Sequence, residues 1–311
     1  MRRSLLVASA LAASIGGCAP PALRTVPAEP GVTAELWDDA SRDRDLYYGV
    51  GGRELAPAEQ ATFAVLKRDP SGFSTTLDLR DGSGREWSAK LGVEAQSEVT
   101  ASRIVWGLGY HQVPSYYVPA LVVTEDGRER AERNVRLRPK VSSLDSQDAW
   151  SWYQNPFVGT RQYRGLIVLM MVLNSTDLKE DNNTVYRRTR EGQAPTHWFV
   201  VKDLGATLGT TGRFSPQRND VEAFERDGFI KGVHDGRVEF HFKGRHQALL
   251  DQITVADVMW TCTQLARLTD RQWDDAFRAG GYGEAVRGRY IAKIKSKIQE
   301  GLALEQREAR R

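Results

Sequence analysis

The chain has 311 residues and a nearly balanced charge, since 43 Lys and Arg residues against 40 Asp and Glu residues leave a net charge of +3 with histidine neutral. The basic residues are scattered rather than gathered into a stripe, so we expect no nucleic-acid binding. Hydrophobic residues make up 41% of the chain, which indicates a globular protein with disorder only at its ends. The length suits a two-lobed catalytic domain with an N-terminal tail.

The chain has two cysteines, Cys18 and Cys262. They cannot form an internal disulfide framework, and no Cys/His cluster has the spacing of a metal site. Cys262 falls within an apolar helical pattern, where we expect it to pack as a small buried hydrophobe.

The N-terminus begins with Arg2-Arg3, continues with the apolar run 5–15 and ends with Gly-Gly before Cys18. This pattern resembles a bacterial lipoprotein signal, in which the cysteine becomes the acylated first residue. The resemblance implies lipid-mediated membrane attachment in the cell envelope at the periplasmic face, and Ala19 favours the outer membrane where one exists. An ordinary secretory signal or an uncleaved anchor is the alternative, although the apolar run is too short to span a bilayer comfortably.

The domain organisation follows from composition. After the signal at residues 1–18, residues 19–45 are rich in Pro, Ala and charge, which predicts a tether. We expect a small lobe at residues 46–138, a larger lobe at 139–305 and a charged tail at 306–311.

Three short strands are predicted early in the small lobe, at residues 63–66, 74–79 and 85–90, because these runs are apolar or β-branched and are separated by turns. The turn between the first two contains Ser71 and Gly72. Its backbone N–H groups could bind an anion such as a phosphate. A plain hairpin turn is an equally good interpretation.

A helix is predicted at residues 94–106 and ends at two glycines. The strand before it alternates, which places Lys90 on the face opposite its apolar residues. Glu98, inside the helix, is our candidate for an ion pair with Lys90, and Glu94 is the second choice. Either glutamate could instead face solvent, and Glu94 could complement the helix dipole.

The rest of the small lobe is predicted to contain strands at residues 116–123 and 134–138, the second at the edge of the sheet. Residues 139–153 are predicted to be a linker. The sequence assigns no pocket for a nucleotide base.

A core helix is predicted at residues 161–173, because its apolar run is too short for a transmembrane helix. A polar loop follows from Asn174 to Asn183. A strand at residues 197–202 then leads to Asp-Leu-Gly, which begins at Asp203. Taken alone, the polar loop could simply be a turn after a helix.

The order of these residues resembles that of protein kinases. Asp177, Lys179 and Asn182 match the Asp-x-Lys-x-x-Asn catalytic loop, and Asp203 begins an Asp-hydrophobic-Gly motif. The strand Trp-Ser-Ala-Lys, which ends at Lys90, resembles the Val-Ala-Ile-Lys strand. An asparagine before the loop in place of His-Arg is closer to HipA-type and other atypical small kinases.

The resemblance implies an α+β fold of the two-lobed protein-kinase-like type, with a small antiparallel sheet plus one helix and a larger, mainly helical lobe. It implies that Lys90, held by Glu98, contacts the phosphates of ATP. Ser71 and Gly72 would lie where a kinase places its glycine-rich loop.

The resemblance also implies roles for the polar loop. Asp177 would orient and deprotonate the acceptor hydroxyl, and Lys179 would steady the γ-phosphate. Asn182 and Asp203 would bind Mg²⁺, which prefers hard oxygen ligands. Asn183 could replace Asn182 if the loop register differs by one residue.

The C-terminal part is predicted to be helical. A buried face runs through residues 255–266, and a Thr269–Gln272 capping box opens the next helix. A last helix carries a buried isoleucine stripe, and three of its lysines are predicted to face solvent, namely Lys293, Lys295 and Lys297.

These patterns support three hypotheses. The first is a membrane-anchored kinase-like phosphotransferase that uses ATP and Mg²⁺ on an unknown acceptor, which could be a protein, lipid, sugar or small metabolite. An exported lipoprotein faces a compartment poor in ATP, so the second is a non-catalytic kinase-like lipoprotein that binds a partner or ligand. The third is a generic envelope lipoprotein in which the catalytic pattern is accidental.

Overall fold

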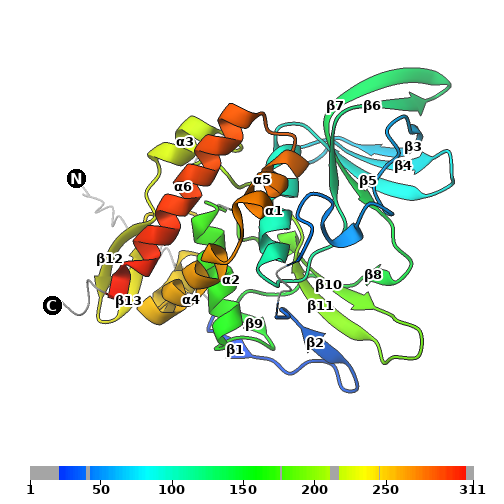
Figure 1. The fold of residues 1–311 in the computed structure, drawn as a ribbon. Helices are drawn as coiled ribbons and strands as arrows, with labels where there is room; N and C mark the ends of the chain where they lie inside the picture. Colours follow the sequence, from blue (N-terminus) through cyan, green and yellow to red (C-terminus); the bar gives the residue numbers. More distant parts are fainter. Residues whose placement is uncertain (1–20, 40–42, 176, 211–216, 245, 306–311) are drawn as a thin grey trace, which may run out of the picture.

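The computed structural model describes five stretches of the chain, residues 21–39, 43–175, 177–210, 217–244 and 246–305 (Figure 1). The expected lipidation site Cys18 and the tail at 306–311 lie outside the described residues. Within them, no helix has the length and apolar character that a membrane crossing requires.

The first half of the chain forms a closed barrel with the strand order β3-β4-β5-β7-β6 (Figure 1). Its strands are β3 (Thr62–Asp69), β4 (Thr76–Asp81), β5 (Glu86–Leu91), β6 (Tyr116–Glu125) and β7 (Arg128–Pro139). The interior is filled by alternate, fully buried side chains such as Phe63, Leu79 and Trp87.

Barrel closure corrects the expectation of a purely antiparallel sheet with residues 134–138 at its edge. β7 pairs with both β5 and β6, so it has no free edge, and β3 closes the barrel through a parallel pairing with β6. Closure pairs each of these five described strands on both sides, so the barrel itself presents no open edge to another chain. Alternation along a strand predicts which side chains face inward, but it does not reveal which strands meet.

One helix, α1 (Glu94–Gly107), lies between the barrel and the helices of the other half (Figure 1). Twelve of its 14 residues are buried, including both glutamates that face the barrel. Burial on nearly all sides is the reason that α1 can fix charged groups between the two halves.

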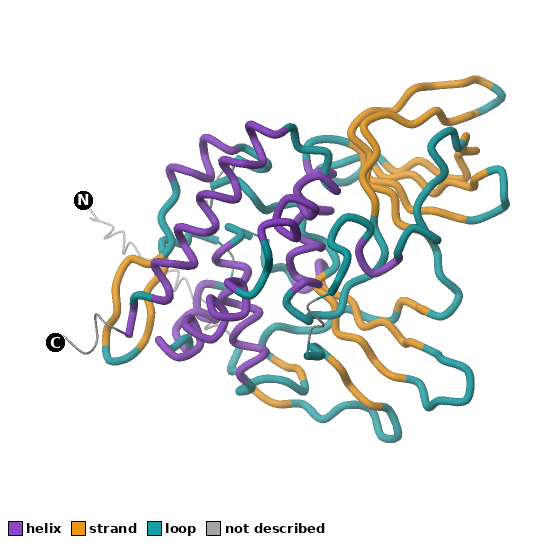
Figure 2. Tube along the Cα trace, in the orientation of Figure 1, coloured by secondary structure: helices purple, strands orange, loops and turns teal. Residues whose placement is uncertain are grey.

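The second half is mainly helical, as the distribution of helices and strands in Figure 2 shows. Its helices are α2 (Arg161–Val172), α3 (Val221–Arg226), α4 (Val255–Ala266), α5 (Asp270–Ala279) and α6 (Glu284–Leu302). Short 3-10 helices are η1 (Gly49–Gly51), η2 (Glu180–Asn182) and η3 (Gln247–Gln252). The predicted core helix is confirmed as α2, whose residues from Leu166 onward are buried. The mixed α and β content that the sequence predicts is also confirmed.

The remaining strands form three small sheets. A four-stranded sheet has the order β2-β11-β10-β8, β1 pairs with β9, and β12 pairs with β13. Their bounds are β1 (Arg24–Thr25), β2 (Thr33–Glu35), β8 (Leu144–Ser146), β9 (Gln154–Asn155), β10 (Asn183–Arg188), β11 (Thr196–Val201), β12 (Ile230–His234) and β13 (Arg237–Phe240). The β10–β11 hairpin is the element that connects the polar loop to Asp203.

Part of the segment predicted as a tether packs against the domain. β1 and β2 lie within it, and β2 pairs in parallel with β11. Leu36, next to β2, is buried in the large core, and the indole of Trp37 donates a hydrogen bond of 2.7 Å to the carbonyl of Leu108. The expected linker likewise contains β8 and the buried Trp150.

The last helix contradicts one expectation. The predicted capping box at Thr269 is present, and Thr254 forms a second one. In the isoleucine stripe of α6, Ile294 and Ile298 are buried and Ile291 is partly buried. Lys297, however, is only 1% exposed instead of facing solvent. It shares a face with Tyr290 and Ile294 through helical spacing, and that face packs against the interior.

The packing of the N-terminal segment is testable with two matched leucines. Leu36→Ala should lower the free energy of unfolding by about 2–5 kcal/mol, the usual cost of emptying a buried leucine site. Leu23→Ala, at an exposed position in the same segment, should change it little. Denaturant unfolding measures both, and equal effects would show that residues 21–39 act as a free tether.

Candidate active site

The site is built around the ammonium group of Lys90, which leaves β5 on the outer face of the barrel. Its Nζ lies 2.9 Å from a Glu94 oxygen and 3.2 Å from a Glu98 oxygen, both on α1. It also lies 2.9 Å from both carboxylate oxygens of Asp203, which follows β11. The structure therefore brings together Lys90, both candidate glutamates and the aspartate of the Asp-Leu-Gly motif.

Solvent reaches this group from one side. The side chains of Lys90, Glu94 and Glu98 are 8%, 4% and 2% exposed, whereas that of Asp203 is 39% exposed. Burial lowers the pKa of Lys90, but the carboxylates of Glu98, Asp203 and Glu94 outweigh burial and hold it above its ordinary value. Lys90 is therefore charged at neutral pH, and a ligand would approach it past Asp203.

Both glutamates have further cationic partners. Arg136 Nε lies 2.9 Å from Glu98, and Arg138 Nη2 lies 3.1 Å from the same oxygen. Glu94 accepts a hydrogen bond of 3.0 Å from the Ser74 hydroxyl and is also ion-paired with Arg218. Each buried carboxylate is thus shared between Lys90 and at least one arginine, which offsets the cost of burying it.

Asp203 is held by its own segment. The Gly205 N–H donates 3.1 Å to Asp203 Oδ1, and the Ser97 hydroxyl on α1 donates 2.8 Å to the Gly205 carbonyl. A Cβ at Gly205 would lie 2.7 Å from Glu94 Cβ and 3.1 Å from Lys90 Nζ. Only glycine allows this close approach, so the third residue of the motif is constrained by packing against α1. Burial raises the pKa of Asp203, but Lys90 and the Gly205 N–H more than compensate and lower it.

The polar loop approaches Asp203 through the β10–β11 hairpin. The backbone N–H of Asp203 donates 3.1 Å to the Asn182 carbonyl, so these two predicted metal ligands are adjacent. The Asn182 side-chain amide donates 2.7 Å to the Asp177 carbonyl, which leaves its oxygen to bind a metal ion. Lys179 Nζ lies 2.8 Å from Asp177.

Asn183, the alternative to Asn182, occupies a different environment. It is buried, and its amide donates 3.0 Å to the carbonyl of Trp150. Asn182 is half-buried on the loop, so the structure favours it as the metal-binding candidate.

The turn between β3 and β4 contains Ser71 and Gly72. The Ser71 N–H already donates 2.9 Å to Asp69, so this predicted phosphate donor is occupied. The next residue, Phe73, is 71% exposed and stacks against the Arg218 guanidinium at 4.0 Å. The turn therefore contacts the segment after Asp203 through a side chain that sequence reasoning did not single out.

A pocket of about 950 Å³ lies between the barrel and the β8–β10 strands. Its lining includes Ser88 and Arg138 from the barrel, and Tyr186 and Lys202 from the other half. Ser88 lies two residues before Lys90 on the same face of β5, and Lys202 precedes Asp203. The lining therefore includes the strand neighbour of Lys90 and the chain neighbour of Asp203, and the sequence alone did not indicate this pocket.

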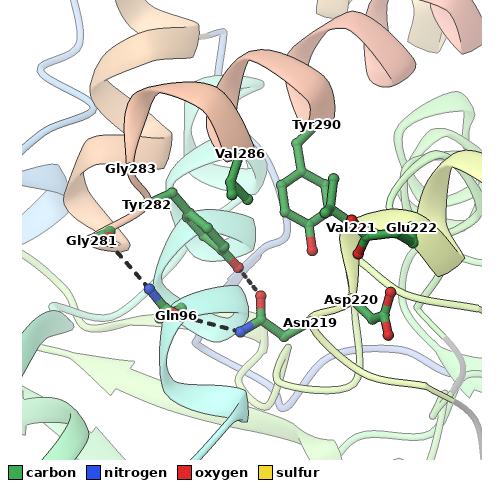
Figure 3. Close-up of a pocket in the computed structure, with 10 residues that line it drawn as sticks. All are labelled: Gln96, Asn219, Asp220, Val221, Glu222, Gly281, Tyr282, Gly283, Val286 and Tyr290. Atoms are coloured by element: carbon green, nitrogen blue, oxygen red, sulfur yellow. Dashed lines mark hydrogen bonds between the residues drawn. The ribbon is translucent and has the colours of Figure 1, made fainter.

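A hydrogen-bond network ties the segment after Asp203 to α1 and to the turn before α6 (Figure 3). Asn219 donates 3.3 Å to Gln96 on α1 and accepts from the Tyr282 hydroxyl. Gln96 donates 3.3 Å to the Gly281 carbonyl. These side chains line a second pocket, and the network positions α1 and therefore its glutamates.

Sequence reasoning missed four residues of the site, namely Ser74, Arg136, Arg138 and Arg218. For the two arginines of β7, alternation along the strand is the available signal, because Leu137 between them faces the barrel interior and the arginines must face outward. The pairing of β7 with β5, which sets Arg136 opposite Lys90, comes from the structure. Nothing in the local sequence of Arg218 marks it, because its contacts with Glu94 and Phe73 join segments that are distant along the chain.

The donor set fits magnesium in a nucleotide complex. Asp203 and Asn182 supply a carboxylate and an amide oxygen, and Mg²⁺ commonly takes only one or two protein ligands beside phosphate oxygens and water. Within the described residues, no group of three or more His, Cys, Asp or Glu side chains could hold a metal ion by itself.

Comparison with known proteins gives weak similarity. No protein-family model matches the chain, and no curated protein matches it in sequence. A solved structure of the proinflammatory kinase CtkA of Helicobacter pylori is similar, with a TM-score of 0.45, 12% identity and coverage of 78% of this chain and 95% of that chain. The Golgi casein kinase is similar with a TM-score of 0.35, 9% identity and coverage of 77% and 72%. At these values the likeness identifies no family.

Removal of the central cation should destabilise the protein. Lys90→Met removes a cation that Glu94, Glu98 and Asp203 share, while the arginines still compensate the two glutamates. We therefore expect a loss of about 1.5–3 kcal/mol in the free energy of unfolding at pH 7, the usual contribution of hydrogen bonds to charged groups. Because Asp203 has a lowered pKa, its share of this stability is present at neutral pH and is lost as the pH falls below about 4. The difference between wild type and variant should therefore shrink on acidification.

Lys67→Met, which removes an exposed lysine from the same barrel, is the control and should be nearly neutral. Denaturant unfolding at pH 7 and at a series of pH values below about 4 measures both variants. A Lys90→Met protein as stable as the control would show that the ion-pair cluster is absent.

Proposed function

We propose that the protein is a membrane-anchored kinase-like phosphotransferase, which transfers the γ-phosphate of ATP to an acceptor with the help of Mg²⁺. The observation that carries the proposal is the convergence of Lys90 and Asp203. They are 113 residues apart in sequence, yet the ammonium contacts both carboxylate oxygens at 2.9 Å, with Glu98 at 3.2 Å on the other side. A strand lysine paired with a helix glutamate beside a metal-binding aspartate is the arrangement that phosphoryl transfer requires.

The architecture supports the same proposal. A β-barrel with one helix lies against a larger, mainly helical part, as expected for a two-lobed kinase-like fold (Figure 1). The 950 Å³ pocket beside Ser88 and Lys202 is large enough for the remainder of a nucleotide. Nucleotide phosphates would then lie toward Lys90, at the side where Asp203 is exposed.

Each residue of the polar loop has a role in this proposal. Asp177 accepts the proton of the acceptor hydroxyl, and Lys179, 2.8 Å from it, balances the charge that builds on the transferred group. Asn182 and Asp203 would hold Mg²⁺, which supplies neutralisation of the phosphate charge. Lys90 orients the phosphates, and Glu98 orients Lys90.

The membrane attachment is part of the proposal and rests on the sequence around Cys18. Acylation of this cysteine would anchor the protein to an envelope membrane through its lipid chains, each buried methylene contributing ~0.8 kcal/mol. The acceptor would then be a component that is accessible from that surface.

The decisive experiment is nucleotide binding by purified protein. Mg²⁺–ATP at 100 times its dissociation constant should stabilise the wild type by about 2.7 kcal/mol, measured as a thermal shift. Asp203→Asn keeps the size of the side chain but removes the ligand charge, so it should abolish the shift, as should EDTA. Transfer to an added acceptor should fall by about 10²–10³-fold.

Asp251→Asn is the control, since it removes an exposed carboxylate far along the chain from the site and should behave as wild type. Absence of any shift in the wild type would favour the second candidate, a non-catalytic kinase-like lipoprotein that binds a partner. One observation favours that candidate: Lys90 is already paired with three carboxylates, with which a phosphate would have to compete.

A further inference from the structure

A buried lysine lies directly behind the start of the polar loop. Lys297 Nζ donates 2.6 Å to Asn174 Oδ1 and 3.0 Å to the carbonyl of Val172, the last residue of α2. The ammonium also lies 4.3 Å from the centre of the Phe224 ring. With an exposure of 1%, Lys297 makes these contacts out of reach of water.

Asn174 is the junction that receives this contact. Its backbone is left-handed, with φ of +52°, a conformation that asparagine tolerates better than most residues. Its side-chain oxygen accepts from Lys297, so its amide nitrogen is turned the other way and donates 2.8 Å to Gly209 O and 3.2 Å to Asp227. Lys297 thereby fixes the orientation of the Asn174 amide, and that amide joins the polar loop to the segment after Asp203.

A second residue of α6 makes a matching contact. The Tyr290 hydroxyl, beside the pocket of Figure 3, donates 3.0 Å to the carbonyl of Leu208. Leu208 also has a left-handed backbone, with φ of +55°, which is strained for a leucine, and its N–H donates 3.0 Å to Leu173. One helix therefore contacts two left-handed backbone positions, one at the first residue of the polar loop and one three residues after the Asp-Leu-Gly motif.

Burial of this amine has a cost that packing alone does not explain. Burial, reinforced by Lys293, lowers the pKa of Lys297 to about 7, and Asp227 and Glu300 only partly oppose the shift. A methionine would fill a similar volume without desolvating a charge. The contacts that only an amine can make are the two hydrogen bonds to Val172 and Asn174.

We propose that Lys297 is a positioning residue that, through Asn174, sets the geometry of the loop carrying Asp177. The proposal rests on the proposed phosphotransferase function. It adds a buried residue, away from the Lys90–Asp203 site, on which the rate of transfer depends. Lys297 does not touch the reacting groups. It determines where the polar loop begins, and the loop determines where the Asp177 carboxylate lies relative to Asp203.

A double-mutant cycle tests the proposal. Lys297→Met removes the donor, and Asn174→Gly removes the acceptor while keeping the freedom to adopt a positive φ. Each variant should lower kcat roughly 10- to 100-fold, the cost of a misplaced catalytic group, with KM for Mg²⁺–ATP nearly unchanged. Because both act through one contact, the double variant should lose no more than the worse single variant.

Lys295→Met is the matched control, because the Lys295 side chain, on the same helix, is 44% exposed and pairs with Asp270 at the surface, so the variant should leave kcat unchanged. Wild-type kcat in Lys297→Met, or losses that multiply in the double variant, would overturn the proposal while leaving the phosphotransferase function intact. A wild type without transfer would overturn both. If Lys297→Met does not fold, Asn174→Gly still tests the contact from the loop side, and wild-type kcat in that variant would overturn the proposal.

A stability measurement tests the burial independently of activity. A lysine whose pKa is lowered in the folded state binds fewer protons there than in the unfolded chain, so its burial costs least at high pH. Any stability advantage of Lys297→Met over wild type should therefore decrease from pH 7 toward pH 10. Denaturant unfolding across this range measures it, and a difference independent of pH would show that Lys297 is solvated and overturn the proposal.

Discussion

The position of the Lys90 ammonium is the constraint on which the rest of the structure depends. It faces three carboxylates in a site that is open to water chiefly at Asp203. Desolvation costs several kcal/mol for each ion, and only contacts at hydrogen-bond distance offset it. The barrel must therefore present Lys90, α1 must be buried on the side of its glutamates, and the β10–β11 hairpin must end close to both.

Two helices hold the polar segments from different sides. α1 contacts the Asp-Leu-Gly segment directly, since Ser97 donates to the Gly205 carbonyl. α6 contacts the same segment and the start of the polar loop through Tyr290 and Lys297. A lysine in a helix is expected on the surface, since charged residues are almost never fully buried unless they are paired. Its neighbours in the fold, and not its neighbours in sequence, account for the burial of Lys297.

The sequence was sufficient for the parts of the site that depend on local periodicity. Alternation along β5 predicted that Lys90 faces away from Trp87, and helical character predicted α1 with Glu94 and Glu98, both of which contact Lys90. Barrel closure could not be predicted, because the β3–β6 pairing joins strands that are far apart along the chain. The same limit applies to Arg218, whose partners belong to other segments. It explains why the sequence predicted the ion pair of Lys90 with the helix but not the residues that surround the two glutamates.

The residues around the two glutamates matter for the proposed function, because Lys90 is already paired with three carboxylates and would have to exchange them to bind a phosphate. If Lys90 turned toward an incoming anion, Glu98 would keep Arg136 and Arg138, and Glu94 would keep Arg218 and the Ser74 hydroxyl. Neither glutamate would be left as an uncompensated buried charge, which is the costly outcome when one partner of a buried pair is lost. Asp203, the one exposed carboxylate, could exchange the lysine for a metal ion. The arginines would therefore allow Lys90 to turn toward a phosphate, because they compensate the charges of the glutamates that would otherwise require the lysine.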